Sequence, residues 1–226
     1  MKIGILFSGG KDSNFVMQHC LDKNFEIKCL ISIIPKNPDS WMYQSVNLKW
    51  TKLQAKAIGL PIIQQPTKGE KEKELKEMKK AIALAKKKFK IEGIGVGAFE
   101  SRYQSDRVQK ICTELGLSVF SPLWQSNQTE ALEKMISIGM EIIFTKIAAL
   151  GLTEKWLGRK LDLQALKELQ ELNAKYGVNI VGEGGEFETF VCYAPFYKKR
   201  VKIISVEKIM ENECTGKILI KKAKLI

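Results

Sequence analysis

Short apolar runs alternate with longer amphipathic segments over the first 125 residues of this 226-residue chain, and this alternation constrains the fold more than any other feature. The apolar runs predict strands, and the segments between them predict helices. The predicted strands are residues 2–7, 27–34, 61–65, 92–97 and 118–123, and the predicted helices are residues 12–23, 42–58, 72–88 and 105–115. This order indicates an α/β fold whose parallel sheet is covered by helices on both faces and binds ligands at the carboxyl ends of its strands.

The pattern changes after residue 125. A helix at residues 128–138 and a strand at 141–146 are followed by a helix at 162–176 with leucines along one face. The rest of the chain predicts strands at residues 178–181, 189–193, 201–209 and 217–224. We therefore expect two domains, residues 1–125 and a smaller α+β lobe of residues 126–226.

The string SGGKDS, residues 8–13, lies between the first predicted strand and the first predicted helix. A helix N-terminus presents unpaired backbone N–H groups, and glycines let that backbone approach an anion closely. Lys11 adds a positive charge, the serines add hydroxyl donors, and Asp12 suits either a helix cap or a magnesium ligand. A plain turn needs neither both glycines nor the lysine, so we interpret the string as a phosphate-binding loop.

A second unusual stretch is GEGGEFET, residues 182–189, which lies between two apolar runs. A hairpin turn needs one or two glycines, whereas this stretch holds three glycines and three carboxylates. Clustered like charges repel one another unless a cation joins them, and a metal, a cationic substrate or a lysine would serve. The residues alone leave two interpretations open, a cation-binding loop and an exposed acidic hairpin.

Composition excludes several kinds of site. His19 is the only histidine, which rules out a poly-histidine metal centre, and the five cysteines form no C-x-x-C pair, which argues against a zinc knuckle or redox site. The net charge of +12 attracts polyanions, but many lysines interleave with glutamates and indicate a solvated helix face. No apolar run is long enough to cross a bilayer, and the N-terminus lacks a signal-peptide pattern. We expect a cytoplasmic protein with no membrane partner.

The phosphate-binding loop resembles the pyrophosphate loop of the N-type ATP pyrophosphatases. Together with the acidic stretch, it is similar to the diphthine–ammonia ligase (diphthamide synthase) family of that superfamily, in an archaeal form. The segments DSWMYQSVN (residues 39–47) and GVGAFESRYQSDRVQKICTELGLSVFSPLWQ (residues 95–125) continue the resemblance, which extends to about residue 199. The resemblance implies a Rossmann-like (adenine nucleotide alpha hydrolase-like) nucleotide-binding domain in residues 1–125 and a substrate-binding lobe in residues 126–226.

The same resemblance implies an enzyme that converts diphthine on elongation factor 2 to diphthamide, using ATP, Mg²⁺ and ammonium. A substrate carboxylate would attack the α-phosphate, pyrophosphate would leave, and ammonia would displace AMP from the acyl-adenylate. Ammonium is expected to be free or delivered by a separate partner, because the chain has no spare domain for a glutaminase. A homodimer is compatible with the sequence, and no nucleic-acid partner is expected.

The resemblance also assigns residues. The catalytic candidates are Lys11, Asp12, Glu183, Glu186 and Glu188, with Asp12 as the metal candidate. ATP is expected to contact Ser8, Gly9, Gly10, Lys11, Asp12, Ser13, Ile31, Ser32, Ile33, Gly97, Ser101, Tyr103, Gln104 and Arg107. The acceptor substrate is expected to contact Tyr43, Gln44, Glu183, Gly184, Gly185, Glu186, Glu188 and Thr189. As bare patterns, Arg107 also fits a surface helix residue and Tyr43 a packed helix start.

Two other functions fit part of the pattern. The positive charge suits an RNA-modifying ATP pyrophosphatase, such as a tRNA thiolase or a lysidine-type ligase, although the chain has no C-x-x-C pair and no recognisable RNA-binding module. A non-catalytic nucleotide sensor could share the fold, but such proteins lack both SGGKDS and the acidic stretch.

Overall fold

The computed structural model describes residues 1–35, 46–67, 73–99 and 102–226, which form two sheets. The first is a five-stranded parallel sheet in the order β3-β2-β1-β4-β5. Its strands are β1 (Lys2–Leu6), β2 (Glu26–Pro35), β3 (Ile62–Thr67), β4 (Gly93–Gly95) and β5 (Ser118–Phe120). This order reverses direction next to β1, as in Rossmann-like folds, so the predicted fold class is confirmed.

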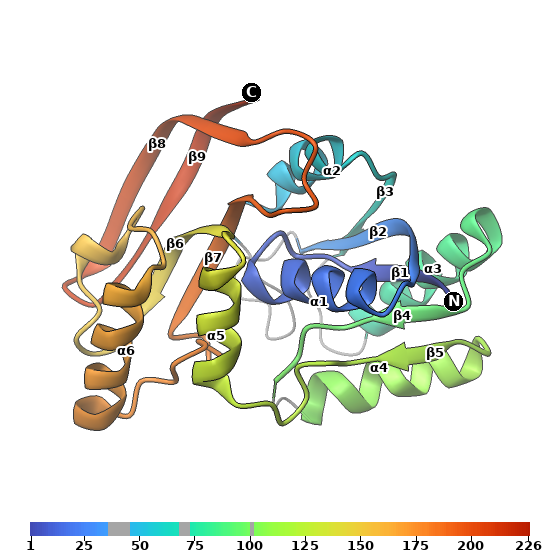
Figure 1. The fold of residues 1–226 in the computed structure, drawn as a ribbon, viewed down its shortest axis with the longest axis horizontal. Helices are drawn as coiled ribbons and strands as arrows, with labels where there is room; N and C mark the ends of the chain where they lie inside the picture. Colours follow the sequence, from blue (N-terminus) through green and yellow to red (C-terminus); the bar gives the residue numbers. More distant parts are fainter. Residues whose placement is uncertain (36–45, 68–72, 100–101) are drawn as a thin grey trace.

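Helices cover both faces of this sheet (Figure 1). The helices α1 (Lys11–Asp22) and α2 (Thr51–Ile58) pack on one face, and α3 (Lys73–Phe89) and α4 (Arg102–Glu114) pack on the other. Neighbouring residues of β2 divide between the faces, since Leu30 packs with α1 and α2 whereas Ile31 packs with α3 and α4. This two-sided burial explains why the strands are continuous apolar runs.

The second sheet is antiparallel, with the order β7-β6-β9-β8. Its strands are β6 (Glu141–Ala148), β7 (Phe187–Tyr193), β8 (Val201–Asn212) and β9 (Thr215–Leu225), and α5 (Gln128–Ser137), a short turn η2 (Glu154–Trp156) and α6 (Leu163–Tyr176) complete the lobe. The helices α5 and α6 are capped at their N-termini by Asn127 and Asp162, whose side chains accept a backbone N–H of the first turn. The predicted α+β lobe is therefore present, with a long β8–β9 ribbon at its edge (Figure 1).

Two of the expected elements are wrong. Residues 178–181 form no strand, because the side chain of Asn179 accepts the N–H groups of Val181 (3.0 Å) and Glu183 (3.2 Å) and bends the chain into a turn. The helix expected at residues 42–58 starts only at Thr51, after a short turn η1 (Leu48–Trp50). Asn47 has a left-handed φ of 64°, so a helix cannot pass through it. Its side chain donates to the Ile218 carbonyl of β9 and accepts the Ile220 N–H of the same strand. Residues 42–45 lie outside the described part.

One hydrophobic core joins the two lobes. Its buried members include Ile5 of β1 and Phe15 of α1, and they pack in the same cluster as Leu132 of α5, Phe144 of β6 and Phe190 of β7. A smaller cluster lies under α3 and α4. The lobes therefore meet through an apolar interface, while the exact boundary at residue 125 stays a prediction.

Within the described residues, no helix combines the length and the apolar character that a membrane span requires.

Candidate active site

The phosphate-binding loop leaves the sheet at the carboxyl end of β1 and enters α1 at Lys11. Gly9 adopts a left-handed φ of 81°, which glycine reaches without strain. Gly10 is the N-cap and offers no side chain, so Asp12 is not the helix cap. The N–H of Gly10 points at Ser8 Oγ (3.3 Å), and Ser8 Oγ lies 3.4 Å from Ser13 Oγ. The loop thus gathers two hydroxyls and a helix N-terminus at the sheet edge where α/β proteins bind ligands.

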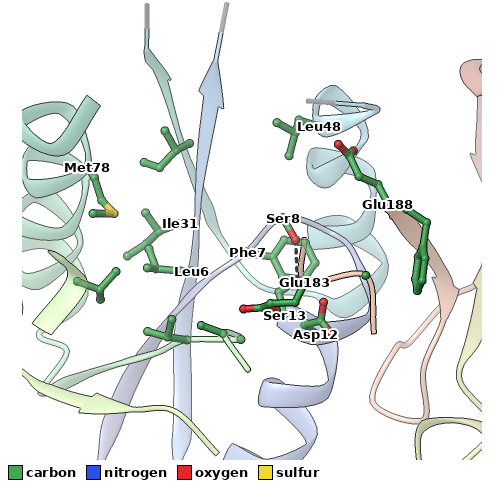
Figure 2. Close-up of a pocket in the computed structure, with 17 residues that line it drawn as sticks. Leu6, Phe7, Ser8, Asp12, Ser13, Ile31, Leu48, Met78, Glu183 and Glu188 are labelled. Carbon is green, nitrogen blue, oxygen red and sulfur yellow. Dashed lines mark hydrogen bonds between the residues drawn. The ribbon is translucent and has the colours of Figure 1, made fainter. Parts of the chain in front are cut away.

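A cavity of about 250 Å³ opens beside this loop (Figure 2). One wall is apolar and comes from three strands and the helices over them. Its members are Leu6, Ile31, Ile33, Met78, Val96 and Val108. The other wall is polar and combines the loop with the acidic stretch, through Ser8, Asp12, Ser13, Glu183 and Glu188. A cavity with one apolar side and one side of donors and carboxylates suits a ligand that carries both an aromatic base and charged groups.

Lys11 connects the two sequence motifs. Its side chain is 3% exposed, and its Nζ donates to the Val181 carbonyl (2.6 Å) and to Asp12 Oδ2 (2.9 Å). Its backbone N–H donates to Thr189 Oγ1 (3.1 Å), which closes the acidic stretch. The lysine does not line the cavity itself but lies between the loop and the residues that precede Glu183. A buried ammonium is tolerated here because both contacts are hydrogen-bonded, one of them to a charge.

The carboxyl group of Asp12 lies in the polar wall of the cavity and has a raised pKa. Burial raises its pKa, the repulsion from Glu183 raises it further, and Lys11 acts in the opposite direction. Among the described residues its Oδ1 is buried and has no hydrogen-bond partner. A carboxylate with one oxygen on Lys11 and one unsatisfied oxygen next to a second carboxylate is suited to hold a cation.

The three glutamates of the acidic stretch have different places. Glu183 and Glu188 line the cavity, and Glu188 accepts from Lys146 Nζ (3.4 Å) and from the Val46 N–H (3.3 Å). Glu186 instead accepts the Asn179 N–H (3.3 Å) and does not line the cavity. Left-handed φ angles at Gly182 (72°) and Gly185 (90°) bend the chain within this stretch. The stretch is therefore a loop that contributes two carboxylates to the cavity, not an exposed acidic hairpin.

Most other expected contacts can be located. Gly97 lines the cavity so closely to α1 that a Cβ there would lie 3.0 Å from the Asp12 carbonyl carbon. Ser32 is buried and its hydroxyl contacts Thr51 Oγ1 (3.5 Å). Neither Arg107, which is half-buried on α4, nor Gly9, Gly10, Gly184, Gly185 or Thr189 lines the cavity. Tyr43, Gln44 and Ser101 lie outside the described residues, and Tyr103 and Gln104 are placed by their backbone on α4 only.

Sequence reasoning missed three residues that contact the two motifs, and a fourth that holds one of the three. Gln54 and Asn14 bind the carbonyls of Gly9 and Gly10, Tyr197 donates to Asn14 Oδ1 (2.8 Å), and Lys146 holds Glu188. One signal was present for Gln54: it shares a helical stripe with Thr51, Ala55 and Ile58, all of which are buried. A glutamine in such a stripe needs buried hydrogen-bond partners.

The described residues hold no cluster of three His, Cys, Asp or Glu side chains that would bind a metal unaided. Any metal here would complete its ligand set with a bound anion or with water.

The sheet order, the loop after β1 and the two-walled cavity define a Rossmann-like protein with a nucleotide-type site at its switch point. Sequence comparison then specifies the family. Residues 1–119 match the diphthamide synthase N-terminal domain, and residues 127–226 match the diphthamide synthase C-terminal domain. The chain therefore belongs to the diphthamide synthase family.

Curated relatives agree with this assignment. The chain is 37% identical to a bovine protein named diphthine–ammonia ligase, over 94% of this chain and 86% of that protein. The human protein of the same name is 36% identical over the same shares. A fission yeast relative, also so named, is 34% identical over 99% of this chain but only 39% of its own length. Among solved structures, the chain is similar to a predicted tRNA methyltransferase subunit from Methanocaldococcus jannaschii, over 77% of this chain and 88% of that protein. The sequence identity is 16% and the TM-score is 0.41, which is too low to support an argument.

Proposed function

We propose that this protein is an ATP-dependent amide ligase that converts diphthine on elongation factor 2 to diphthamide with ammonium, releasing AMP and pyrophosphate. Its family membership and its curated relatives support the reaction. The observation that carries the proposal structurally is the junction of two distant motifs in one cavity. Lys11, from the first motif, is bonded to Val181, and Asp12 faces the same cavity as Glu183.

The cavity divides naturally between the parts of ATP. The apolar wall, including Ile31 and Met78, would take the adenine, because a flat aromatic base gains most from apolar contact. The hydroxyls of Ser8 and Ser13 and the N–H of Gly10 would take phosphate oxygens at the start of α1. With the phosphates held there, the carboxylate of diphthine would attack the α-phosphorus. One P–O bond forms, the bond to the β-phosphate breaks, and pyrophosphate leaves.

The second half of the reaction needs ammonia next to the acyl-adenylate. Ammonium is attracted by carboxylates, and Glu183 and Glu188, both from the C-terminal lobe, supply two to the cavity. One of these carboxylates would take a proton from ammonium so that its nitrogen can attack the acyl carbon. The C–N bond forms as the bond to AMP breaks, and the nitrogen releases a second proton to water. The fixed positive charge of diphthine would be attracted to the same carboxylates.

The residues also fit a magnesium ion. Asp12 presents a buried oxygen without a partner, and Glu183 is near enough to raise the Asp12 pKa by repulsion. Mg²⁺ in nucleotide sites uses one or two protein carboxylates and completes its shell from phosphates and water. Such an ion would neutralise charge on the departing pyrophosphate. We place the reaction in the cytoplasm, where the elongation factor works.

The decisive test is an assay on elongation factor 2 that carries diphthine. With ATP and ammonium, the protein should form AMP and pyrophosphate, and mass spectrometry should find the acid-to-amide mass change at the modified histidine. A factor lacking diphthine serves as the control and should give no AMP. Formation of ADP and phosphate, or AMP formation that requires tRNA in place of the factor, would contradict the proposal.

Replacing Asp12 with asparagine should separate stability from activity. Burial raises the folded pKa of Asp12 above its value in the unfolded chain, so the ionised form costs stability at every pH above that folded pKa. The cost fades as the pH falls through the folded pKa and is absent below the ordinary value of 3.8. Asp12→Asn should therefore raise the Tm at pH 7 but not at pH 3, while AMP formation falls about tenfold because a charge-assisted contact is lost.

The control for Asp12→Asn is Asp22→Asn, at the exposed end of the same helix. Asp22→Asn should have the same Tm as the wild-type protein at both pH values and the same rate of AMP formation. An Asp12→Asn protein with a lower Tm at pH 7 would show that the carboxylate stabilises the fold and would count against a cation-binding role.

A further inference from the structure

A buried glutamine lies directly behind the phosphate-binding loop. Gln54, on α2, is fully buried, and its Nε2 donates to the carbonyls of Gly9 (2.8 Å) and Val191 (2.8 Å). The Val191 N–H donates to the same Gly9 carbonyl at 3.0 Å. Two donors from outside the loop, one from α2 and one from β7, therefore hold a single carbonyl of the loop.

Holding this carbonyl also directs an N–H. In a trans peptide, the C=O of one residue and the N–H of the next point in opposite directions, and the described residues contain no cis bond. With the Gly9 carbonyl turned toward Gln54, the Gly10 N–H must turn away from it. It points at Ser8 Oγ, and Ser8 lines the cavity. The glutamine thus sets the direction of an N–H on the cavity side of the loop.

The side chain of Gln54 also fills the space next to Gly9. A Cβ added to Gly9 would lie 2.2 Å from Gln54 Oε1, and Gly9 has a left-handed φ of 81°. A glycine peptide is otherwise free to turn over, because both signs of φ are accessible to it. The packed amide blocks that motion, so the loop keeps one arrangement.

The neighbouring peptide is held in the same way. Asn14 Nδ2 donates to the Gly10 carbonyl (2.8 Å), and Tyr197 from the C-terminal lobe donates to Asn14 Oδ1 (2.8 Å). Each of the two glycine carbonyls therefore has its own amide side chain, and both amides also bond to the C-terminal lobe. A glutamine that merely bridged the lobes would not need to bond the loop.

We propose that Gln54 is a positioning residue for the phosphate-binding loop, which orients the Gly9–Gly10 peptide so that its N–H meets the pyrophosphate part of ATP. This inference rests on the proposed function, in which that loop binds the phosphates. Gln54 itself does not line the cavity and acts only through the peptide that it holds.

Binding measurements without an acceptor test the role. Gln54→Met keeps the length of the side chain and removes the donor, so the Kd of ATP should rise about tenfold while the Kd of adenosine, which makes no loop contact, stays unchanged. The Kd of inorganic pyrophosphate should rise by a similar factor. The matched control is Gln64→Met: Gln64 on β3 donates to Thr51 Oγ1 (2.8 Å) of the same helix α2 but does not touch the loop. It should leave the ratio of ATP to adenosine affinity unchanged.

An unchanged ratio in Gln54→Met would overturn the proposal, and so would an equal loss in Gln64→Met, because a general disturbance of α2 would then explain both. If Gln54→Met does not fold, Gln54→Glu takes its place; it has the same shape but turns a carboxylate toward two carbonyl oxygens, so the ratio should fall further. A preserved ratio there would also overturn the role. A wild-type protein that binds adenosine as tightly as ATP would overturn the proposed function together with this inference.

Discussion

Replacing Lys11 with methionine should lower the kcat/KM for AMP formation by about 10³-fold. The lysine does not line the cavity, but its positive charge is bonded to Asp12, which does, and the loss of one preorganised charged group near developing charge typically costs that much. The lysine is the positive charge of the phosphate-binding loop, and it is also bonded to the Val181 carbonyl and to Asp12. Methionine has a similar length and cannot replace either contact. The measurement is release of AMP and pyrophosphate with the diphthine-bearing factor at saturating ammonium.

The free Lys11→Met protein should also be less stable. The buried Val181 carbonyl loses its partner, which costs about 2 kcal/mol in the free energy of unfolding. Lys23→Met, just beyond the exposed end of α1, is the control and should change neither quantity. A Lys11→Met enzyme that turns over at the wild-type rate would remove the loop from the mechanism.

Replacing Gly9 with alanine should have the second largest effect. The new Cβ would lie 2.2 Å from Gln54 Oε1, and alanine would be forced to a φ of 81°. The backbone penalty and the overpacking together should cost about 3 kcal/mol in the free energy of unfolding. Because the loop must shift to relieve the clash, the KM for ATP should rise about 10²-fold.

Gly139 provides a closely matched control for the Gly9 experiment. It has the same φ of 81°, but nothing lies within 4 Å of a Cβ added there. Gly139→Ala should therefore show the backbone penalty alone, about 1 kcal/mol, with an unchanged KM for ATP. Equal losses in the two variants would mean that the contact between Gly9 and Gln54 contributes nothing. Denaturant unfolding and steady-state kinetics measure both quantities.

Local patterns were enough to predict the first sheet and its loop. The strand β1, the two glycines and the start of α1 follow one another within the first 13 residues, so short-range periodicity and glycine chemistry specify them. The assignment of β6 could not be reached in this way. Its helix–strand pattern looks like another unit of the parallel sheet, yet it pairs antiparallel with β7 and β9. Which sheet a strand joins depends on residues far away in sequence.

Only part of the candidate site could be predicted, because only part of it depends on local sequence patterns. The composition of the first motif indicated Ser8 and Asp12, the family resemblance added Glu183 and Glu188, and the structure places all four around one cavity. Which of the glutamates line the cavity could not be predicted, because this depends on the left-handed turns at Gly182 and Gly185. Gln54 was missed because its partners are backbone carbonyls, which no pattern of side chains reveals.

The common core of the two lobes limits how this protein can be divided. Cutting the chain near residue 125 would leave Phe15 and Ile5 on one piece and Leu132 and Phe190 on the other without the surfaces that bury them. Neither piece would then be a module that could be exchanged, tagged at the junction or expressed by itself. Insertions belong instead at the tip of the β8–β9 ribbon, around the exposed Glu213, which lies outside that core.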